Sequence, residues 1–179
     1  MKKHNNLIIL LLFVLGCGLF IEFNFRYWYC FMEQYMMFQT TSTYLLKHLT
    51  EPGGMIEYVT EFLSMGFVFP LCAATTIAVI LGAISLCFHR YLKAYQVNRS
   101  LFVATIPSFL LLLFPQETIA HFLTILIAVA CAVAYTSIKS DKLRWGAGFV
   151  MLTTIYLLAA PANIIFALLV TIYESLTHR

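Results

Sequence analysis

The sequence has few charged residues, since Asp, Glu, Lys and Arg make up 11% of its 179 residues. A soluble domain carries roughly a quarter. Hydrophobic residues reach 61%, and the mean hydropathy is +0.87. These values exclude an ordinary soluble domain and indicate that lipid surrounds most of the chain. Once the apolar segments are set aside, only residues 22–65 form a sizeable region outside the bilayer, so we expect a single membrane domain over residues 1–179.

The short motifs of common enzyme sites are also missing. The sequence has no phosphate-binding glycine loop, no Gly-x-Ser-x-Gly, no His-Glu-x-x-His and no Cys-x-x-Cys. Its five cysteines are dispersed. Four of them fall in apolar segments, where a thiol behaves as a small hydrophobe. We therefore expect no cofactor, no metal site and no disulfide framework.

What the sequence does have is basic charge gathered into clusters between apolar stretches. Nine of the eleven Lys and Arg residues lie in four clusters: Lys2, Lys3; Arg90, Lys93, Arg99; Lys139, Lys142, Arg144; and Arg179. Such clusters mark the cytoplasmic ends of membrane spans. Because they sit at segment ends, without a basic helix to follow phosphates, the net charge of +3 does not indicate a nucleic-acid partner.

The apolar segments predict an all-α, polytopic transmembrane protein of about six spans. Their approximate bounds are 7–23, 66–88, 101–114, 119–138, 146–160 and 163–174. The stretch 101–138 is too long for one span and has to turn, and Pro115 with the polar residues after it predicts a hairpin tip outside the membrane. Pro161 predicts a second turn. If the last segment is instead one kinked, tilted helix, the chain has five spans.

The first apolar segment admits two interpretations, a cleaved signal and a retained helix. Its Val14-Leu15-Gly16-Cys17 is similar to a lipoprotein cleavage site, but the sequence stays apolar after Cys17. We therefore expect a retained first span with the N-terminus in the cytoplasm. The large loop, residues 24–65, then lies outside.

This outer loop is predicted to lie on the membrane surface. Aromatic residues crowd its first half, and such rings prefer the headgroup level. Residues 33–49 are a first helix candidate, and Pro52-Gly53-Gly54 forms an elbow after it. Met55, Ile56, Val59, Phe62 and Leu63 then recur at helical spacing, with Glu57, Thr60, Glu61 and Ser64 on the other side. The second half is thus predicted to be an amphipathic interfacial helix.

Candidate site residues are few. Glu33 interrupts the aromatic stretch and could act as a general base toward a hydroxyl or help hold a divalent cation. It could equally be an interfacial acid that points to water. Glu117 and His121, four residues apart, share a helix face, but two ligands do not make a metal site. Glu57 and Glu61 are most simply solvated.

Several motifs of the first half resemble an uncharacterised family of bacterial multi-spanning inner-membrane proteins, a domain of unknown function. They are Glu33-Gln34-Tyr35-x-x-Phe38, Tyr44-Leu45, Pro52-Gly53-Gly54-Met55, Tyr58, Glu61-Phe62-Leu63 and Pro70. The resemblance implies a bacterial inner-membrane location. Members of that family are usually longer, which implies that this chain is a short member or a fragment.

The order of elements is also similar to the start of membrane glycosyltransferases that use polyprenyl-phosphate sugars. In that superfamily the first outer loop carries an acidic base or metal contact, and Glu33 is the residue that would match it. The usual paired acids are absent here. This resemblance implies a catalytic Glu33 and a polyprenyl-phosphate lipid as partner.

Two functional hypotheses follow. The first is a non-catalytic scaffold or subunit whose small residues, such as Ala78 and Gly82, let helices pack against each other or against other membrane subunits. The second is a remnant or small relative of a lipid-linked sugar transferase acting on the outer face. In both, the lipid bilayer is the immediate partner.

Overall fold

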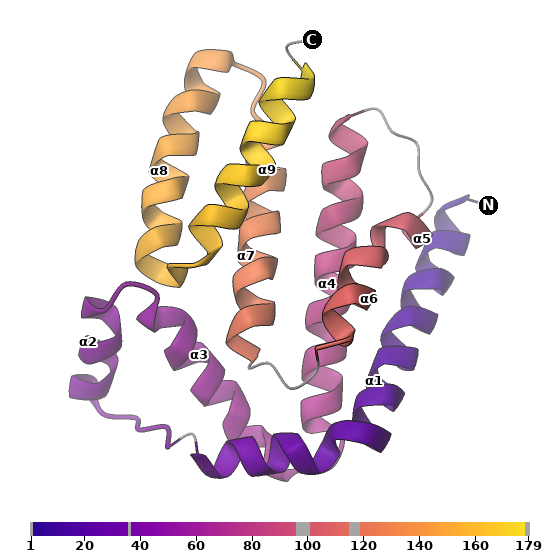
Figure 1. The fold of residues 1–179 in the computed structure, drawn as a ribbon, viewed down its shortest axis with the longest axis vertical. Helices are drawn as coiled ribbons and strands as arrows, with labels where there is room; N and C mark the ends of the chain where they lie inside the picture. The colour runs from indigo at the N-terminus through magenta and orange to yellow at the C-terminus, as the bar shows by residue number, and fades with distance from the viewer. Residues whose placement is uncertain (1, 36, 96–100, 115–118, 178–179) are drawn as a thin grey trace.

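The computed structural model describes residues 2–35, 37–95, 101–114 and 119–177, and no strand occurs among them (Figure 1). This confirms the predicted all-α class. The helices are α1 (Lys2–Tyr35), α2 (Ser42–Thr50), α3 (Gly54–Ser64), the 3₁₀ helix η1 (Met65–Val68), α4 (Cys72–Ala94), α5 (Leu101–Ala104), α6 (Ile106–Leu112), α7 (Ile119–Thr136), α8 (Asp141–Ala159) and α9 (Ala162–Thr177).

Helices α4 and α7 form the centre of the bundle, with α1 and α6 on one side and α8 and α9 on the other (Figure 1). One apolar core lies between α1, α4 and α7, and a second lies between α7, α8 and α9. The small residues of α4 face α1. A Cβ on Gly82 would come within 2.7 Å of Val14 Cγ2, and one on Gly18 would lie 3.6 Å from Ala78 Cβ. The small-residue face is therefore used inside the chain.

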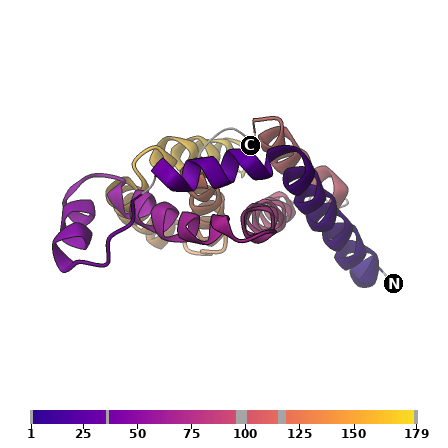
Figure 2. The same cartoon turned by 90° about the horizontal axis from the view of Figure 1, so that it is seen from below.

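Helix α1 continues well beyond the predicted end of the first span near Phe23. It bends near its middle, and its second half runs across the lower end of the molecule (Figures 1 and 2). Asn24 donates its side-chain amide to the Phe20 carbonyl at 2.8 Å, a contact of the kind that bends helices. The second half is held where the ring of Tyr29 meets Phe67 edge-on, with centroids 6.0 Å apart.

The elements of the outer loop gather at this same end, which we call the loop end: the second half of α1, α2, α3 and η1. The opposite end, where α4 stops and α8 starts, is called the basic end because Lys93, Lys139 and Lys142 lie there (Figure 1). The predicted helix over 33–49 is wrong. Residues 37–41 are not helical, and they separate α1 from α2.

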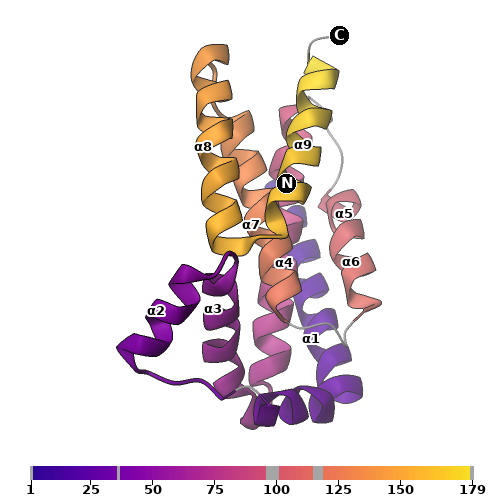
Figure 3. The same cartoon turned by 60° about the vertical axis from the view of Figure 1, so that its left-hand side comes forward.

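The predicted Pro-Gly-Gly elbow is confirmed, and it does more than re-aim the chain. Gly53 has a φ of +83°, which favours glycine, and its N–H donates to the Leu157 carbonyl at 3.0 Å. The elbow thus docks on the turn between α8 and α9, and α2 and α3 stand below that turn (Figure 3). A Cβ on Gly54 would come within 2.3 Å of the His48 carbonyl oxygen, so α2 and α3 meet backbone to backbone.

Helix α3 exists as predicted, but its orientation differs. The buried face consists of Ile56, Thr60 and Ser64, whereas Phe62 is 57% exposed. The prediction had placed Thr60 and Ser64 on the outward side. The reason is that α3 packs against α7 and α8, and this close approach places its small hydroxyl residues in the contact.

The six predicted spans are not confirmed. Within the described ranges, three helical stretches are long and apolar enough to cross a membrane: Asn6–Tyr35, Cys72–Ala94 and Ile119–Thr136. The predicted span 101–114 is broken at Thr105, and α6 begins at Ile106 with Pro107 in its first turn, where proline has no backbone N–H to continue the preceding helix. Its twelve residues, Leu101–Leu112, would extend only about 18 Å against a bilayer core of about 30 Å. The predicted turn at Pro115 lies outside the described residues.

The last segment forms two helices and not one kinked helix. α8 begins at Asp141, five residues before the predicted start, and ends at Ala159. α9 starts at Ala162 and runs back antiparallel to it (Figure 1). Helix α9 is among the shorter apolar helices. The predicted turn at Pro161 is therefore confirmed, although neither helix adds to the three candidate spans.

Candidate functional site

The sequence-predicted site residues do not come together. Glu33 lies in the last turn of α1, half-buried, and it is not among the residues that line the cavity at the loop end. His121 is on the exposed side of the first turn of α7 and does line that cavity. Its predicted partner Glu117 lies outside the described residues. Within the described ranges, no three His, Cys, Asp or Glu side chains are grouped as metal ligands.

A cavity of about 370 Å³ opens where α3, the start of α7 and the α8–α9 turn meet. Its lining comes from three separate stretches of the chain that the fold brings together: Pro52, Gly53, Ile56, Glu57, Thr60, Glu61; Ala120, His121, Thr124; and Ala159, Pro161. On α3, the lining residues follow helical spacing and form one stripe. The elbow docking described above is what holds this stripe against the bundle.

The cavity lining combines polar and apolar side chains, and α7 contributes the polar His121 and Thr124 opposite α3. Glu57 and Glu61 bring two carboxylates, and Thr60 brings a hydroxyl. Ala120 and Ala159, from α7 and α8, supply small apolar walls. No Lys or Arg is among the described lining residues, so the two carboxylates make the described lining acidic.

Glu61 belongs to a cluster that joins α2 to α3, which we call the loop-end cluster: Tyr44, His48 and Glu61. The Tyr44 hydroxyl donates to Glu61 Oε2, and His48 Nε2 lies 3.7 Å from the same oxygen. This hydrogen bond to a carboxylate, assisted by burial, raises the pKa of Tyr44 to about 12. The rings of Tyr44 and His48 meet edge-on at 4.7 Å. One carboxylate oxygen of Glu61 is therefore oriented by two side chains.

Two buried polar groups at this end have no hydrogen-bond partner among the described residues. They are the hydroxyl of Thr60, a residue 2% exposed, and the ring nitrogens of His48, which is 6% exposed. A buried polar group without a partner costs about 1–3 kcal/mol. Such groups are uncommon in folded proteins and each calls for a reason.

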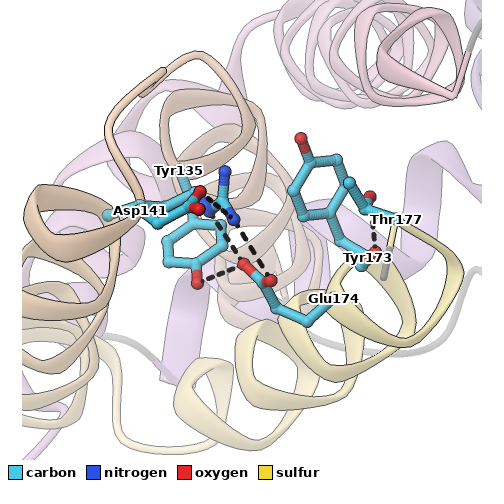
Figure 4. A network of polar contacts seen from close by, with 6 residues as sticks. Tyr135, Asp141, Tyr173, Glu174 and Thr177 are labelled. Atoms are coloured by element: carbon cyan, nitrogen blue, oxygen red, sulfur yellow. Dashed lines mark hydrogen bonds and ion pairs between the residues drawn. The ribbon is translucent and has the colours of Figure 1, made fainter. Parts of the chain in front are cut away.

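A second cluster, the basic-end cluster, comprises Tyr135, Arg144 and Glu174 (Figure 4). Arg144 Nε donates to Glu174 Oε1 at 2.8 Å and Nη2 donates to Oε2 at 3.2 Å. The Tyr135 hydroxyl donates to Oε1 at 2.8 Å. The Arg144 guanidinium also lies 5.6 Å from the centroid of the Tyr173 ring and 3.0 Å from Asp141 Oδ1.

The geometry of the basic-end cluster is that of a clamp between α7, α8 and α9. The side chains of Arg144 and Glu174 are only 6% and 10% exposed, and the bidentate arrangement is the strong form of this ion pair. Sequence analysis used Arg144 only as a topology signal and overlooked Glu174. A carboxylate within a largely apolar helix needs a partner, and that rule would have pointed to the pair.

These features define an all-helical protein with three helices long and apolar enough to cross a membrane and with one Tyr–Glu cluster at each end. More specifically, the chain belongs to a family of unknown function (DUF6057), whose family model matches residues 2–179. The match confirms the resemblance to an uncharacterised family. No curated protein and no solved structure matches the chain, so the similarity to polyprenyl-phosphate-sugar transferases gains no support.

Proposed function

We propose that this protein is a non-catalytic integral protein of the bacterial inner membrane, a scaffold or subunit of a larger membrane assembly. The observation that supports this most is the use of polar side chains inside the bundle. They join one helix to another. The basic-end cluster joins α8 to α9 and α7. Charged groups that pair with one another in this way hold the helices together.

Two further links have the same character. The Ser85 hydroxyl donates to Ser108 Oγ at 2.8 Å, and Ser108 donates to the Leu81 carbonyl at 2.9 Å, which joins α4 to α6. The Tyr91 hydroxyl donates to the Leu169 carbonyl at 2.7 Å, which joins α4 to α9. Interhelical hydrogen bonds of this kind hold membrane bundles together. A rigid bundle suits a scaffold.

In our proposal the basic end faces the cytoplasm, with the N-terminus inside and the loop end outside. Lys93, Lys139 and Lys142 at the basic end support this orientation, since cytoplasmic loops carry the excess of Lys and Arg. Glu51 and Glu57 lie at the loop end but contribute little to orientation.

Cysteine labelling in intact cells tests the orientation. Native Cys30 is a poor reporter, because it is partly buried and its thiol donates to the Phe67 carbonyl at 3.2 Å. Thr43→Cys, at an exposed position of α2, should react with an impermeant thiol reagent in a background without native cysteines. Ser140→Cys, exposed at the basic end, should react only after permeabilisation. The reverse labelling pattern would show the opposite orientation and contradict the proposed topology.

A partner helix would fit the outward face of α8. This face carries Gly146, Val150 and Thr154 at intervals of four residues, all exposed, and a Cβ on Gly146 would meet nothing within 4 Å. Small residues such as Gly146 and Thr154 let two membrane helices approach closely. The Thr154 hydroxyl is already bonded to the Val150 carbonyl at 2.9 Å, so the face can be buried without leaving that donor unpaired.

The subunit role is tested by native electrophoresis of mildly solubilised membranes. The wild-type protein should migrate in a complex larger than its own micelle, and Gly146→Leu should release it. Gly16→Leu is the matched control, because Gly16 is an equally open glycine on the far helix α1. A wild-type protein that migrates alone would remove the basis of the proposal.

The transferase remains a second proposal that rests on Glu33. It is supported by the position of Glu33 on the part of α1 that crosses the loop end, the side that the proposed orientation places outside. Saturable binding of a polyprenyl-phosphate sugar to the wild type, lost in a folded Glu33→Gln variant, would favour it. Equal binding by both proteins, or none, would exclude a role for Glu33.

A further inference from the structure

The geometry points to the loop-end cavity as a binding site for a compact organic ammonium compound. Among the described residues, the cavity is lined by the carboxylates of Glu57 and Glu61 and by no Lys or Arg. A cationic group is the complement of such a lining, because a carboxylate and an ammonium group form charge-assisted hydrogen bonds. This inference is independent of the subunit role, which concerns the opposite face of α8.

An independent observation at the same cavity also indicates a ligand. Thr60 lines the cavity from its buried side and is 2% exposed, and its hydroxyl has no hydrogen-bond partner among the described residues. An ammonium group has several N–H donors, so it can donate to the Thr60 oxygen and to a carboxylate at once. A bound ammonium group therefore accounts for a polar atom that has no partner among the described residues.

Glu61 is prepared for this role by the loop-end cluster. Tyr44 and His48 both contact its Oε2, which fixes the direction of the carboxylate and leaves Oε1 for a ligand. Tyr44 and His48 are positioning residues in this scheme, since neither lines the cavity. A preformed carboxylate lowers the ordering cost of binding.

The size and the apolar wall limit the ligand. A cavity of about 370 Å³ is at the small end of the range of about 300–1,000 Å³ for ligand sites. Ile56, Ala120 and Ala159 offer an apolar wall to a short carbon chain. The site thus fits a free diamine or the ethanolamine headgroup of a phospholipid, and it is too small for acyl chains.

The test uses the full-length protein in nanodiscs of phosphatidylcholine and titrates putrescine by calorimetry. We expect saturable binding, weakened at least about tenfold by Glu57→Gln, the usual effect of losing a charged hydrogen bond. Glu51→Gln is the matched control. It removes the same charge three residues before Gly54, at an exposed position outside the cavity lining, and it should leave the affinity unchanged.

Thr60→Val separates a ligand contact from a structural role. Valine has nearly the same shape but no hydroxyl, so the variant should be more thermostable than the wild type while it binds putrescine several-fold more weakly. A purely structural Thr60 would move both properties in the same direction, which would contradict its assignment as a contact.

A second set of nanodiscs that contains phosphatidylethanolamine identifies the source of the ammonium group. If the lipid headgroup occupies the cavity, putrescine binding should be suppressed there. If the ligand is a free amine, both sets should bind alike. No saturable binding in phosphatidylcholine, or equal weakening by Glu57→Gln and Glu51→Gln, would overturn the assignment.

Discussion

The two ends of the molecule carry clusters of the same composition, a tyrosine, a glutamate and a basic side chain. At the basic end, Tyr135 and Arg144 use both oxygens of Glu174. At the loop end, Tyr44 and His48 both contact one oxygen of Glu61, and the ring nitrogens of His48 have no hydrogen-bond partner among the described residues.

This difference shows how the same residue types can have different roles. In a buried ion pair whose acceptor oxygens are all hydrogen-bonded, each partner satisfies the other. Such a pair joins helices and offers no acceptor to a ligand. A carboxylate with spare acceptor capacity beside a cavity is free for a ligand. Geometry, more than residue type, thus separates the clamp from the candidate site.

The largest effect is expected from breaking the basic-end cluster. Glu174→Leu leaves the Arg144 guanidinium buried without its bidentate partner and should lower the free energy of unfolding by about 3–5 kcal/mol. Thermal unfolding in detergent micelles measures this. The double variant Arg144→Leu/Glu174→Leu should recover much of the loss, because no unpaired charge then remains buried.

Asp141→Asn is the control at the same end. Asp141 also contacts Arg144, but its side chain is 68% exposed, so its loss should cost less than about 1 kcal/mol. If Asp141→Asn were as damaging as Glu174→Leu, the cluster would not be the closed clamp described above.

The next effect concerns the join between α2 and α3. Gly54→Ala places a Cβ within 2.3 Å of the His48 carbonyl oxygen, and relieving that overlap requires backbone movement that costs about 1–3 kcal/mol. We expect faster proteolysis of residues 37–53 and a lower thermal midpoint. Gly146→Ala, where the new Cβ meets nothing within 4 Å, should be neutral or stabilising by up to about 1 kcal/mol.

A smaller effect, of about 1–2 kcal/mol, is expected for Tyr44→Phe, which removes a hydrogen bond to a charged acceptor. It also tests pH dependence. Because folding raises the pKa of Tyr44 from its usual value of about 10 to about 12, the contribution is complete below pH 10 and is lost as the pH rises toward 12. The ultraviolet absorbance of tyrosinate should show one late-titrating group fewer in the variant. If the group lost in the variant titrates near the usual value of about 10 instead, Tyr44 does not donate to Glu61.

The smallest effect has the opposite sign. Thr60→Val removes a buried hydroxyl that lacks a partner among the described residues, so the protein without ligand should gain about 1 kcal/mol in stability. Ser108→Val is the comparison, because Ser108 is buried but fully bonded, and its replacement should destabilise. A loss of stability in both variants would show that Thr60 is satisfied after all.

The sequence was sufficient for the elements whose signals are local. Apolar length predicted α4 and α7, and Pro52-Gly53-Gly54 and Pro161 predicted two turns. The burial of Thr60 and Ser64 was missed because it depends on which neighbours α3 meets. The same is true of both Tyr–Glu clusters, whose members are 30 and 39 residues apart at the basic end. Periodicity carries no information about contacts at that separation. The role of Glu33 remains a prediction.

The hydrogen bond from Gly53 to the Leu157 carbonyl has a consequence for the order of assembly. Residues 42–64 leave the ribosome long before α8 and α9 exist, and chains fold from the N-terminus as they are made. Helices α2 and α3 therefore lack the α8–α9 turn, against which the elbow docks, until about a hundred further residues have been synthesised. The cavity is completed only when the turn between α8 and α9 has formed, so a finished site requires that residues 141–177 have folded.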